Sequence, residues 1–240
     1  MSLYGSRGVH GQTVATIAQR VLSGELAEGA TLDLVALQAE LDVSLTALRE
    51  SLKVLAAKGL VDARQKRGTF VRPRADWNLL DPDVLRWQFS AEADVSLLRS
   101  LHEVRTIVEP AAVRLAAERH TEKDLARLDE ALAAMAEAAH DPRGAVEADL
   151  AFHRALLDAT HNELLTRMQT VLESALAARD QLVHGTAKHS DDPVPSHRAV
   201  LDGVRARDPA AAEAAMRSLL EKAISDESLL TQADEDEDEA

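Results

Sequence analysis

The sequence predicts a mostly α-helical protein in two parts, a small N-terminal domain and a larger helical bundle. Alanine and leucine dominate the composition, and aromatic residues make up only 2% of the 240 residues. Runs of β-branched residues, which are typical of strands, are scarce. Apolar residues instead recur every three or four positions over most of the chain, which is the spacing of a buried helix face. The length suffices for one large or two modest domains.

The composition excludes several classes of protein. The chain has no cysteine, which excludes disulfides and thiolate metal sites and is compatible with a reducing cytosol. No apolar run approaches the roughly 20 residues of a membrane-spanning helix. The N-terminus MSLYGSRGVHGQ lacks the apolar core of a signal peptide. We therefore expect a soluble, cytoplasmic protein with no membrane partner.

Three short helices are expected first. Apolar residues follow helical spacing in QTVATIAQRVLSGEL, and Gly24 lies where glycine often ends a helix. Two further helices are predicted by LDLVALQAEL and SLTALRESLKVLAAKG, which are joined through Asp-Val-Ser. Ser44 is a good N-cap for the third helix, and Gly59 lies at its end.

A β-hairpin is expected after these helices. Residues 60–63 and 69–72 have the character of short strands, and the basic turn between them contains Gly68. Three helices followed by a hairpin form the pattern of a winged helix-turn-helix, which we assign to residues 8–74. Two prolines and a change in charge sign then predict a linker over residues 75–90.

The remaining chain is predicted to be an antiparallel all-helical bundle of about six or seven helices over residues 91–230. One helix has a buried stripe from Leu97 to Leu115, and another begins at Thr121 with Asp124 in the capping-box position. The later helices are expected over residues 144–160, 162–183, 196–207 and 209–229. The run of acidic residues near the C-terminus predicts a disordered tail over residues 231–240.

Charge is distributed unevenly along the chain. The net charge of −14 would by itself argue against nucleic acid as a partner. Residues 49–74, however, hold eight basic and two acidic residues, and thus a net charge of +6. This basic segment coincides with the predicted third helix and hairpin, which favours double-stranded DNA as a partner.

The third helix supplies the expected base contacts. In a helix-turn-helix, the second helix of the motif enters the major groove with its N-terminal residues facing base edges. That helix would present Ser44, Thr46 and Arg49. Arg49 can donate two bonds to a guanine, and Thr46 can donate to a phosphate.

The hairpin supplies the expected wing contacts. Lys66 and Arg67 can reach the DNA backbone or the minor groove, and Gly68 would allow a tight turn. A single basic helix is more often a solvated surface. The ordered helices together with a basic hairpin make DNA binding the favoured interpretation.

Two spaced pairs in the helical part are candidates for a site. DLAFHRALLDATHN places Asp149 and His153 four residues apart, so they lie one above the other on a helix. The pair could be catalytic, half of a metal site, or a hydrogen-bonded pair at the edge of a core, and the last is the most frequent case. Arg105 precedes Glu109 by four residues, which most simply predicts an ion pair.

Several motifs carry a family resemblance. The elements SGEL..G..L, VS.T.LRESL..L...GLV and RGTFV, within residues 22–71, resemble the DNA-binding domain of the GntR family of bacterial transcription regulators. EVRTIVEPAAVRLAA and DLAFHRALLDATHN resemble the ligand-binding FCD domain of its FadR-type branch. WNLLDPDVLRW resembles the linker of the sugar-acid, galactonate-type regulators in that branch. The resemblance covers nearly the whole chain.

The recognition helix departs from the family pattern at two positions. Leu45 stands where the family usually has arginine, and Ala47 stands where it usually has proline. Loss of a bidentate donor removes about 1 to 3 kcal/mol of base discrimination. The operator is therefore expected to differ from that of better-known relatives.

The resemblance implies a metal site of one aspartate and three histidines inside the bundle. Asp149, His153 and His197 match three positions, whereas Leu219 stands where the fourth histidine is expected. Such donors suit a divalent ion of the zinc, nickel or manganese type and leave coordination positions open. His184 or His189 could replace the fourth ligand, although exposed loop histidines are the commoner case.

The resemblance also implies an effector site. The family's arginine at Arg105 points into a cavity and binds a carboxylate, which suits a planar guanidinium. His102 could line the same cavity, though packing is its commoner role. We expect a homodimeric regulator, most simply a repressor, that binds a palindromic operator and responds to a small organic acid, such as a sugar acid, with the help of the metal.

Two alternatives remain open at this point. One is a constitutive dimeric DNA-binding protein without an effector. The other is a metal-dependent hydrolase fused to a winged domain. No general base and no phosphate-binding glycine loop is evident beside the candidate ligands, so we expect no enzyme activity.

Overall fold

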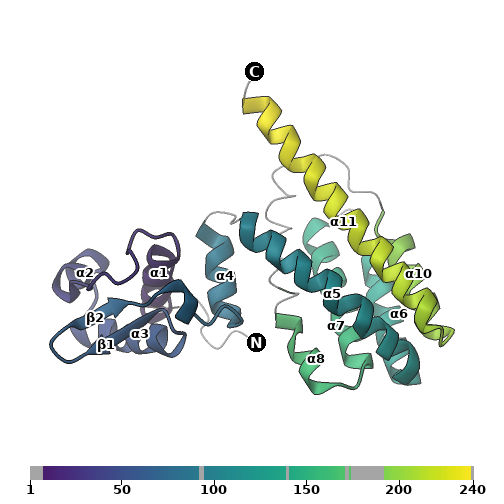
Figure 1. Cartoon of the computed structure of the whole chain (residues 1–240), viewed down its shortest axis with the longest axis horizontal. Helices are drawn as coiled ribbons and strands as arrows, with labels where there is room; N and C mark the ends of the chain where they lie inside the picture. The colour runs from purple at the N-terminus through teal and green to yellow at the C-terminus, as the bar shows by residue number, and fades with distance from the viewer. Residues whose placement is uncertain (1–7, 92–94, 139–140, 171–172, 174–191, 239–240) are drawn as a thin grey trace. The chain divides into compact units, whose positions relative to one another are not determined.

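The computed structural model describes residues 8–91, 95–138, 141–170, 173 and 192–238, and it divides into two compact units, residues 1–94 and 95–240 (Figure 1). The described part is mostly helical with one small antiparallel sheet, so the predicted fold class is confirmed. Within the described residues, no helix combines the length and the apolar character needed to cross a membrane.

The first unit is a three-helix domain with a hairpin and an additional helix. Its elements are α1 (Val9–Leu22), α2 (Leu34–Leu41), α3 (Leu45–Ala57), β1 (Val61–Arg64), β2 (Gly68–Val71), a 3-10 turn (Arg74–Asp76) and α4 (Pro82–Ala91). The two strands pair antiparallel, with Val61 opposite Val71. The domain core packs apolar residues of α1 and α3 against the hairpin: Val14, Ile17, Val21, Leu48, Leu52, Leu55, Leu60, Val61 and Val71.

Side-chain caps fix the ends of α2 and α3. Asp33 accepts hydrogen bonds from the backbone N–H groups of Val35 and Ala36. Ser44 accepts one from Ala47 at 3.2 Å, which confirms its predicted role as an N-cap. The left-handed Asp42 lies directly after α2 and starts the turn that leads to Ser44. These caps set the start of the predicted recognition helix.

The residues expected to form a linker differ from the prediction, because most of them fold onto the first unit. Helix α4 packs against α1, and Trp77 and Trp87 are both buried in the core of that unit. Two prolines in this stretch predict a break, but one of them begins a helix. Pro82 is the first residue of α4, where proline is well tolerated, and Asp81 accepts from the N–H of Val84 as a cap.

A buried ion cluster joins the end of α3 to the start of α4. Lys58 follows α3, and its Nζ lies 2.7 Å from Asp81 Oδ1 and 2.9 Å from Asp83 Oδ2. Burial alone would lower the pKa of Lys58, but the two carboxylates raise it overall. The Nζ also lies 5.6 Å from the centroid of a Trp87 ring. The residue that follows α3 is therefore tied by charge to the start of α4, while α4 itself packs against α1.

The second unit is a helical bundle. Its described helices are α5 (Val95–Arg119), α6 (Glu122–Glu137), α7 (Pro142–Ala159), α8 (Glu163–Arg167), α10 (Val194–Arg205) and α11 (Pro209–Asp238). Helix α11 packs against α5 and α10, and α6 packs against α7 (Figure 1). Leu128, Leu132, Phe152, Leu201 and Met216 lie at the centre of the core, each at most 1% exposed.

Two segments of the bundle differ from the sequence predictions. The helix expected over residues 162–183 is interrupted: α8 ends at Arg167, Met168 forms a turn, residues 169–170 and 173 are helical again, and the other residues up to 183 lie outside the described part. Helix α11 continues to Asp238, through most of the acidic segment for which a disordered tail was expected.

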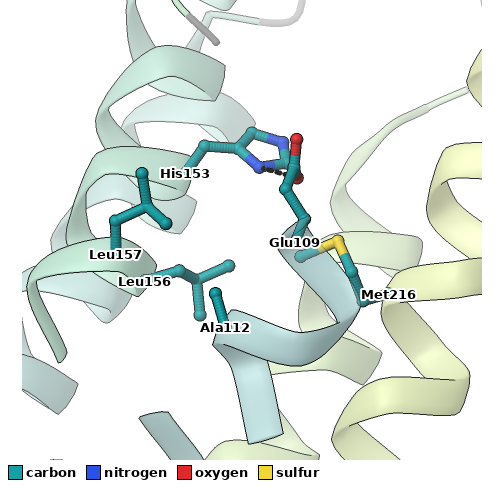
Figure 2. Close-up of a pocket in the computed structure, with 6 residues that line it drawn as sticks. All are labelled: Glu109, Ala112, His153, Leu156, Leu157 and Met216. Atoms are coloured by element: carbon teal, nitrogen blue, oxygen red, sulfur yellow. Dashed lines mark ion pairs between the residues drawn. The ribbon is translucent and has the colours of Figure 1, made fainter. Parts of the chain in front are cut away.

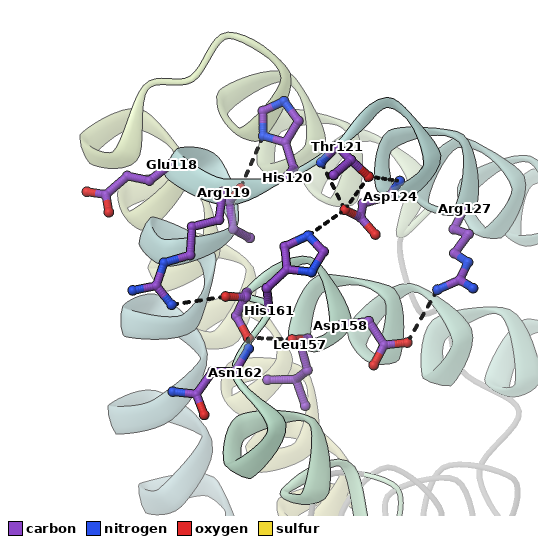
Figure 3. Close-up of polar contacts among 12 residues, drawn as sticks. Glu118, Arg119, His120, Thr121, Asp124, Arg127, Leu157, Asp158, His161 and Asn162 are labelled. Atoms are coloured by element: carbon purple, nitrogen blue, oxygen red, sulfur yellow. Dashed lines mark hydrogen bonds and ion pairs between the residues drawn. The ribbon is translucent and has the colours of Figure 1, made fainter.

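A polar corner stabilises the start of α6 (Figure 3). Thr121 and Asp124 form the predicted capping box, in which each side chain accepts from the other residue's backbone N–H. His161 Nε2 lies 2.9 Å from Asp124 Oδ2, and Arg119 donates to the carbonyl of Thr160. The corner therefore connects the α5–α6 turn with the residues that follow α7.

We expect Asp124→Ala to lower the free energy of unfolding by about 1 kcal/mol, the usual value of a lost helix cap. Burial alone would raise the pKa of Asp124, but hydrogen bonds from Thr121 and His161 lower it overall. This stabilisation is therefore present above the unfolded-state pKa and is lost as the pH falls through the folded-state pKa. Urea denaturation at pH 7 and at pH 3 measures both effects. Glu122→Ala, in the same helical turn, is the control and should change little.

Candidate functional site

The N-terminal half of α3 exposes the residues predicted to read DNA. Thr46 and Arg49 are exposed, while Leu48 and Leu52 of the same helix are buried in the domain core. Ser44 is exposed as well, but its oxygen already caps α3, so its hydroxyl proton is the group that could be offered to DNA. The helix thus turns the predicted contact residues away from the core.

The two predicted contact residues of the wing differ in their surroundings: Lys66 is exposed at the tip, and Arg67 braces the hairpin. Lys66, in the turn between β1 and β2, and Gly68, the first residue of β2, both have positive φ, of 72° and 80°. Arg67 folds back, donates to the carbonyl of Gly29 at 2.9 Å and lies 3.6 Å from the centroid of the Phe70 ring. The structure therefore gives Arg67 a bracing contact that the sequence did not predict. Its DNA contact stays a prediction.

We expect Lys66→Gly to separate DNA affinity from stability. Glycine adopts positive φ without the steric cost that lysine incurs, so the free energy of unfolding should stay within about 1 kcal/mol of the original or rise. If Lys66 contacts a phosphate, operator affinity should fall and the slope of log affinity against log salt should decrease by about 0.9. Fluorescence anisotropy at several salt concentrations tests this. Lys66→Arg keeps the charge and should retain the slope.

Two helices of the second unit bring together the residues predicted to bind metal. Asp149 and His153 lie on α7, and His197 lies on α10. Each offers one ligand atom, and these atoms lie within 4.8 Å of one another. Asp149 Oδ1 is 2.8 Å from His197 Nε2 and 3.7 Å from His153 Nε2. Both histidines are buried, with 3% and 4% exposed.

The second nitrogen of each imidazole contacts a protein acceptor. His197 Nδ1 lies 2.8 Å from the carbonyl oxygen of Pro193, which places its proton on Nδ1 and leaves a lone pair on Nε2. His153 Nδ1 lies 2.7 Å from Glu109 Oε2, as an ion pair rather than a well-angled hydrogen bond (Figure 2). Both rings therefore direct Nε2 toward Asp149.

The donor set fits a divalent metal ion. The Nε2 atoms of His153 and His197 are buried and have no hydrogen-bond partner. A lone pair held 2.8 Å from a carboxylate oxygen is repulsive unless a proton or a cation lies between the two atoms. One carboxylate and two imidazoles, each anchored through its other nitrogen, form the arrangement that zinc and similar ions use. These three residues could hold such an ion, with coordination positions left open.

The fourth ligand that the family resemblance implies is absent from its position on α11. Leu219 is 6% exposed and belongs to the apolar core together with Met216. His184 and His189, the possible replacements, lie outside the described residues.

Glu109 is the residue of this cluster whose importance the sequence did not reveal. Its Oε1 lies 2.6 Å from Arg105 Nε, which bears out the predicted ion pair, and its Oε2 faces His153. Burial alone would raise the pKa of Glu109, but the charges of His153 and Arg105 lower it to about 2. The i,i+4 spacing revealed the contact with Arg105, but no local signal indicated that α7 supplies the second partner.

The pKa values of Asp149 and His153 are also shifted by their charged neighbours in the cluster. Burial alone would raise the pKa of Asp149, but His153, His197 and Arg105 lower it overall. Burial would lower the pKa of His153, but Glu109 and Asp149 raise it. The cluster is thus a network of buried charges whose members stabilise each other's ionised forms.

The cavity beside this network is small. It is lined by Glu109, Ala112, His153, Leu156, Leu157 and Met216 (Figure 2), with a volume of about 10 Å³. That volume is close to the minimum for one water molecule, whereas ligand pockets usually measure about 300 Å³ or more. A sugar acid would therefore need to displace some of these side chains. Arg105 itself is buried, with 2% exposed.

Comparison with known proteins gives two family matches. Residues 10–71 match the gntR family of bacterial regulatory proteins, and residues 100–222 match the FCD domain. The galactonate operon transcriptional repressor of Escherichia coli K12 is 34% identical over 209 residues, which cover 86% of this chain and 91% of that protein. The transcriptional regulator LutR of Bacillus subtilis is 34% identical over 202 residues, which cover 82% and 90%.

Two solved structures show the same fold at low identity. Lar, which is described as controlling the expression of the Listeria monocytogenes agr system, superposes with a TM-score of 0.64 at 18% identity, covering 91% of this chain and 96% of that one. E. coli McbR/YncC superposes with a TM-score of 0.55 at 19% identity, covering 94% and 98%. Their likeness concerns the fold alone.

Proposed function

Since this chain belongs to the GntR family of bacterial regulatory proteins and carries an FCD domain, we propose that it is a homodimeric repressor that releases its operator when a small carboxylate binds. The families and relatives that match are transcriptional regulators and not enzymes. The buried network of Arg105, Glu109, Asp149, His153 and His197 carries the proposal, because it combines a carboxylate-binding group with a metal-binding set.

The winged domain supplies the DNA-binding half of the mechanism. The N-terminus of α3 would enter the major groove with Thr46 and Arg49 facing the DNA, while Lys66 reaches the backbone from the wing. Two copies related by a two-fold axis would read a palindromic operator. Such a regulator acts on DNA in the cytoplasm.

We expect Arg49→Ala to weaken specific operator binding by about 1 to 3 kcal/mol, the contribution of one bidentate contact to guanine. Arg49 is exposed on α3, so the fold and the dimer should be unaffected. Competition binding with operator and random DNA measures the loss of specificity. Lys53→Ala, on the same helix and paired with Glu50, is the matched control. If Arg49→Ala prefers operator over random DNA as strongly as the original chain does, Arg49 does not contact the operator bases.

The helical domain supplies the sensing half. Asp149, His153 and His197 would hold a divalent ion of the zinc, nickel or manganese type, which offers open positions to oxygen atoms of the effector. Arg105 would bind the effector's carboxylate with two parallel donors. Because the cavity is small, effector binding must separate packed side chains, which gives the ligand different affinities for two conformations. That difference is what allows it to shift DNA affinity.

A sugar acid is the proposed class of effector. The galactonate operon repressor, at 34% identity over most of both chains, supports this class. A hydroxylated carboxylate is also a suitable bidentate ligand for a metal with open positions, and its carboxylate suits Arg105.

Metal analysis and thermal unfolding of the purified protein test the proposal. We expect a bound transition metal, and stabilisation by one member of a panel of galactonate, gluconate and other sugar acids. A ligand at a hundred times its Kd should add about 2.7 kcal/mol. The same acid should release operator DNA in an anisotropy assay. A protein that no member of the panel stabilises would instead be the constitutive DNA-binding dimer.

A further inference from the structure

Glu109 uses its two carboxylate oxygens on two different functional groups. Oε1 lies 2.6 Å from the Nε of Arg105, one turn earlier on α5. Oε2 lies 2.7 Å from the Nδ1 of His153 on α7. The side chain of Glu109 is 3% exposed, so both contacts are shielded from solvent. A single carboxylate thus connects the proposed effector-binding residue with a proposed metal ligand.

We propose that Glu109 is a positioning residue for both halves of the sensing site: it holds the His153 ring with Nε2 toward the metal and fixes the guanidinium of Arg105 for the effector. This inference rests on the proposed function of the site. Glu109 is not placed as a ligand itself, because it contacts Nδ1, whereas the ligand atoms gather around Asp149 Oδ1 on the other side of the ring. Its action on the metal is through His153.

The geometry explains why a carboxylate is used at this position. A histidine that binds metal through Nε2 must carry its proton on Nδ1, and an acceptor at Nδ1 fixes that tautomer and makes the ring a stronger ligand. The carbonyl of Pro193 performs this task for His197 at 2.8 Å. Glu109 holds the corresponding place for His153, with Oε2 2.7 Å from Nδ1.

Charge balance supports the same assignment. Metal binding requires both imidazoles to be neutral. In that state, with Arg105 positive and Glu109 and Asp149 negative, the cluster has a net charge of −1. A divalent ion would change this to +1, which one effector carboxylate neutralises. Without the negative charge of Glu109, the metal-loaded site would be strongly cationic and buried, which is costly. Glu109 therefore makes the pocket suited to a metal and one monoanion together.

Four proteins separate positioning from simple charge pairing: the original chain, Glu109→Gln, Arg105→Gln and the double variant. The double variant keeps the net charge of the cluster at −1, because it removes one positive and one negative group. Zn²⁺ and Co²⁺ affinities would be measured by competition with a chelator, and the visible absorption of bound Co²⁺ would report ligand geometry. Circular dichroism would confirm that each variant is folded.

We expect Glu109→Gln and the double variant to bind metal about 10- to 100-fold more weakly, the usual effect of losing a partner of a ligand histidine. Both should also show a changed Co²⁺ spectrum. Arg105→Gln should bind metal at least as tightly as the original chain, because it removes a repelling charge. If the double variant regains the original affinity and spectrum, Glu109 is only a counterion and the inference is wrong. If the original chain binds neither ion, the metal part of the proposed function fails as well.

Discussion

Lys58→Met is expected to lower the free energy of unfolding by about 3 to 5 kcal/mol, because it takes the buried ammonium away from two partly buried carboxylates, of which Asp83 keeps a contact with Arg86. Lys58 is 8% exposed, and it contacts Asp81 and Asp83 at 2.7 and 2.9 Å. Those aspartates belong to the start of α4, so the loss should also loosen the attachment of α4 to α3. Urea denaturation followed by circular dichroism measures the change.

Two controls make this result specific. Lys53→Met removes a lysine from α3 whose side chain is 73% exposed, and it should change stability by no more than about 0.5 kcal/mol. Combining Lys58→Met with Asp81→Asn and Asp83→Asn removes both carboxylates along with the ammonium, and it should recover much of the lost stability because Arg86, which loses its contact with Asp83, is 47% exposed to solvent. Asparagine at residue 81 can still cap α4. If Lys58→Met is as stable as Lys53→Met, the cluster does not tie the two helices.

Arg105→Lys is expected to raise the effector concentration needed for operator release by about 10- to 150-fold, which corresponds to about 1.5 to 3 kcal/mol for a lost charged hydrogen bond. Lysine keeps a positive charge beside Glu109 but cannot present two parallel donors to a carboxylate. Arginine to alanine at this position would abolish the response as well, but it would leave Glu109 buried with one partner fewer. Operator release would be followed by anisotropy while the effector is titrated.

The matched control for this experiment is Arg114→Lys. Arg114 lies on the same helix α5, but its side chain is 46% exposed and pairs with Glu213 at the surface. This variant should respond to effector as the original chain does. Operator binding without effector should persist in both variants, because neither residue belongs to the winged domain. An Arg105→Lys protein that releases DNA at the original concentration would show that the effector's carboxylate is bound elsewhere.

Local chemistry made much of the fold predictable. Ser44 and the Thr121–Asp124 pair are caps whose effect depends only on residues a few positions away, and the structure has both. The strands of the wing lie within one residue of their predicted bounds. In these cases, residues a few positions apart in the sequence determine the local backbone structure.

Contacts between distant segments were the part that spacing could not supply. Nothing near Trp77 and Trp87 in the sequence indicates that α1 offers an apolar face to cover them, so the sequence predicts a linker where the structure has a packed helix. Glu109 meets His153 only because α5 packs against α7. The gathering of Asp149 and His153 with His197 was expected from family resemblance, and spacing alone would not have brought in a residue of α10.

The packing of α4 against α1 determines where the chain can be truncated when the DNA-binding domain is expressed alone. A fragment that stops at Arg74 loses Trp77, Val84 and Trp87 from its hydrophobic core and leaves Lys58 without either aspartate. Such a truncation should aggregate or be degraded on expression. A fragment that extends through Ala91 retains all of these groups. It is the shortest fragment that should fold as an isolated DNA-binding domain.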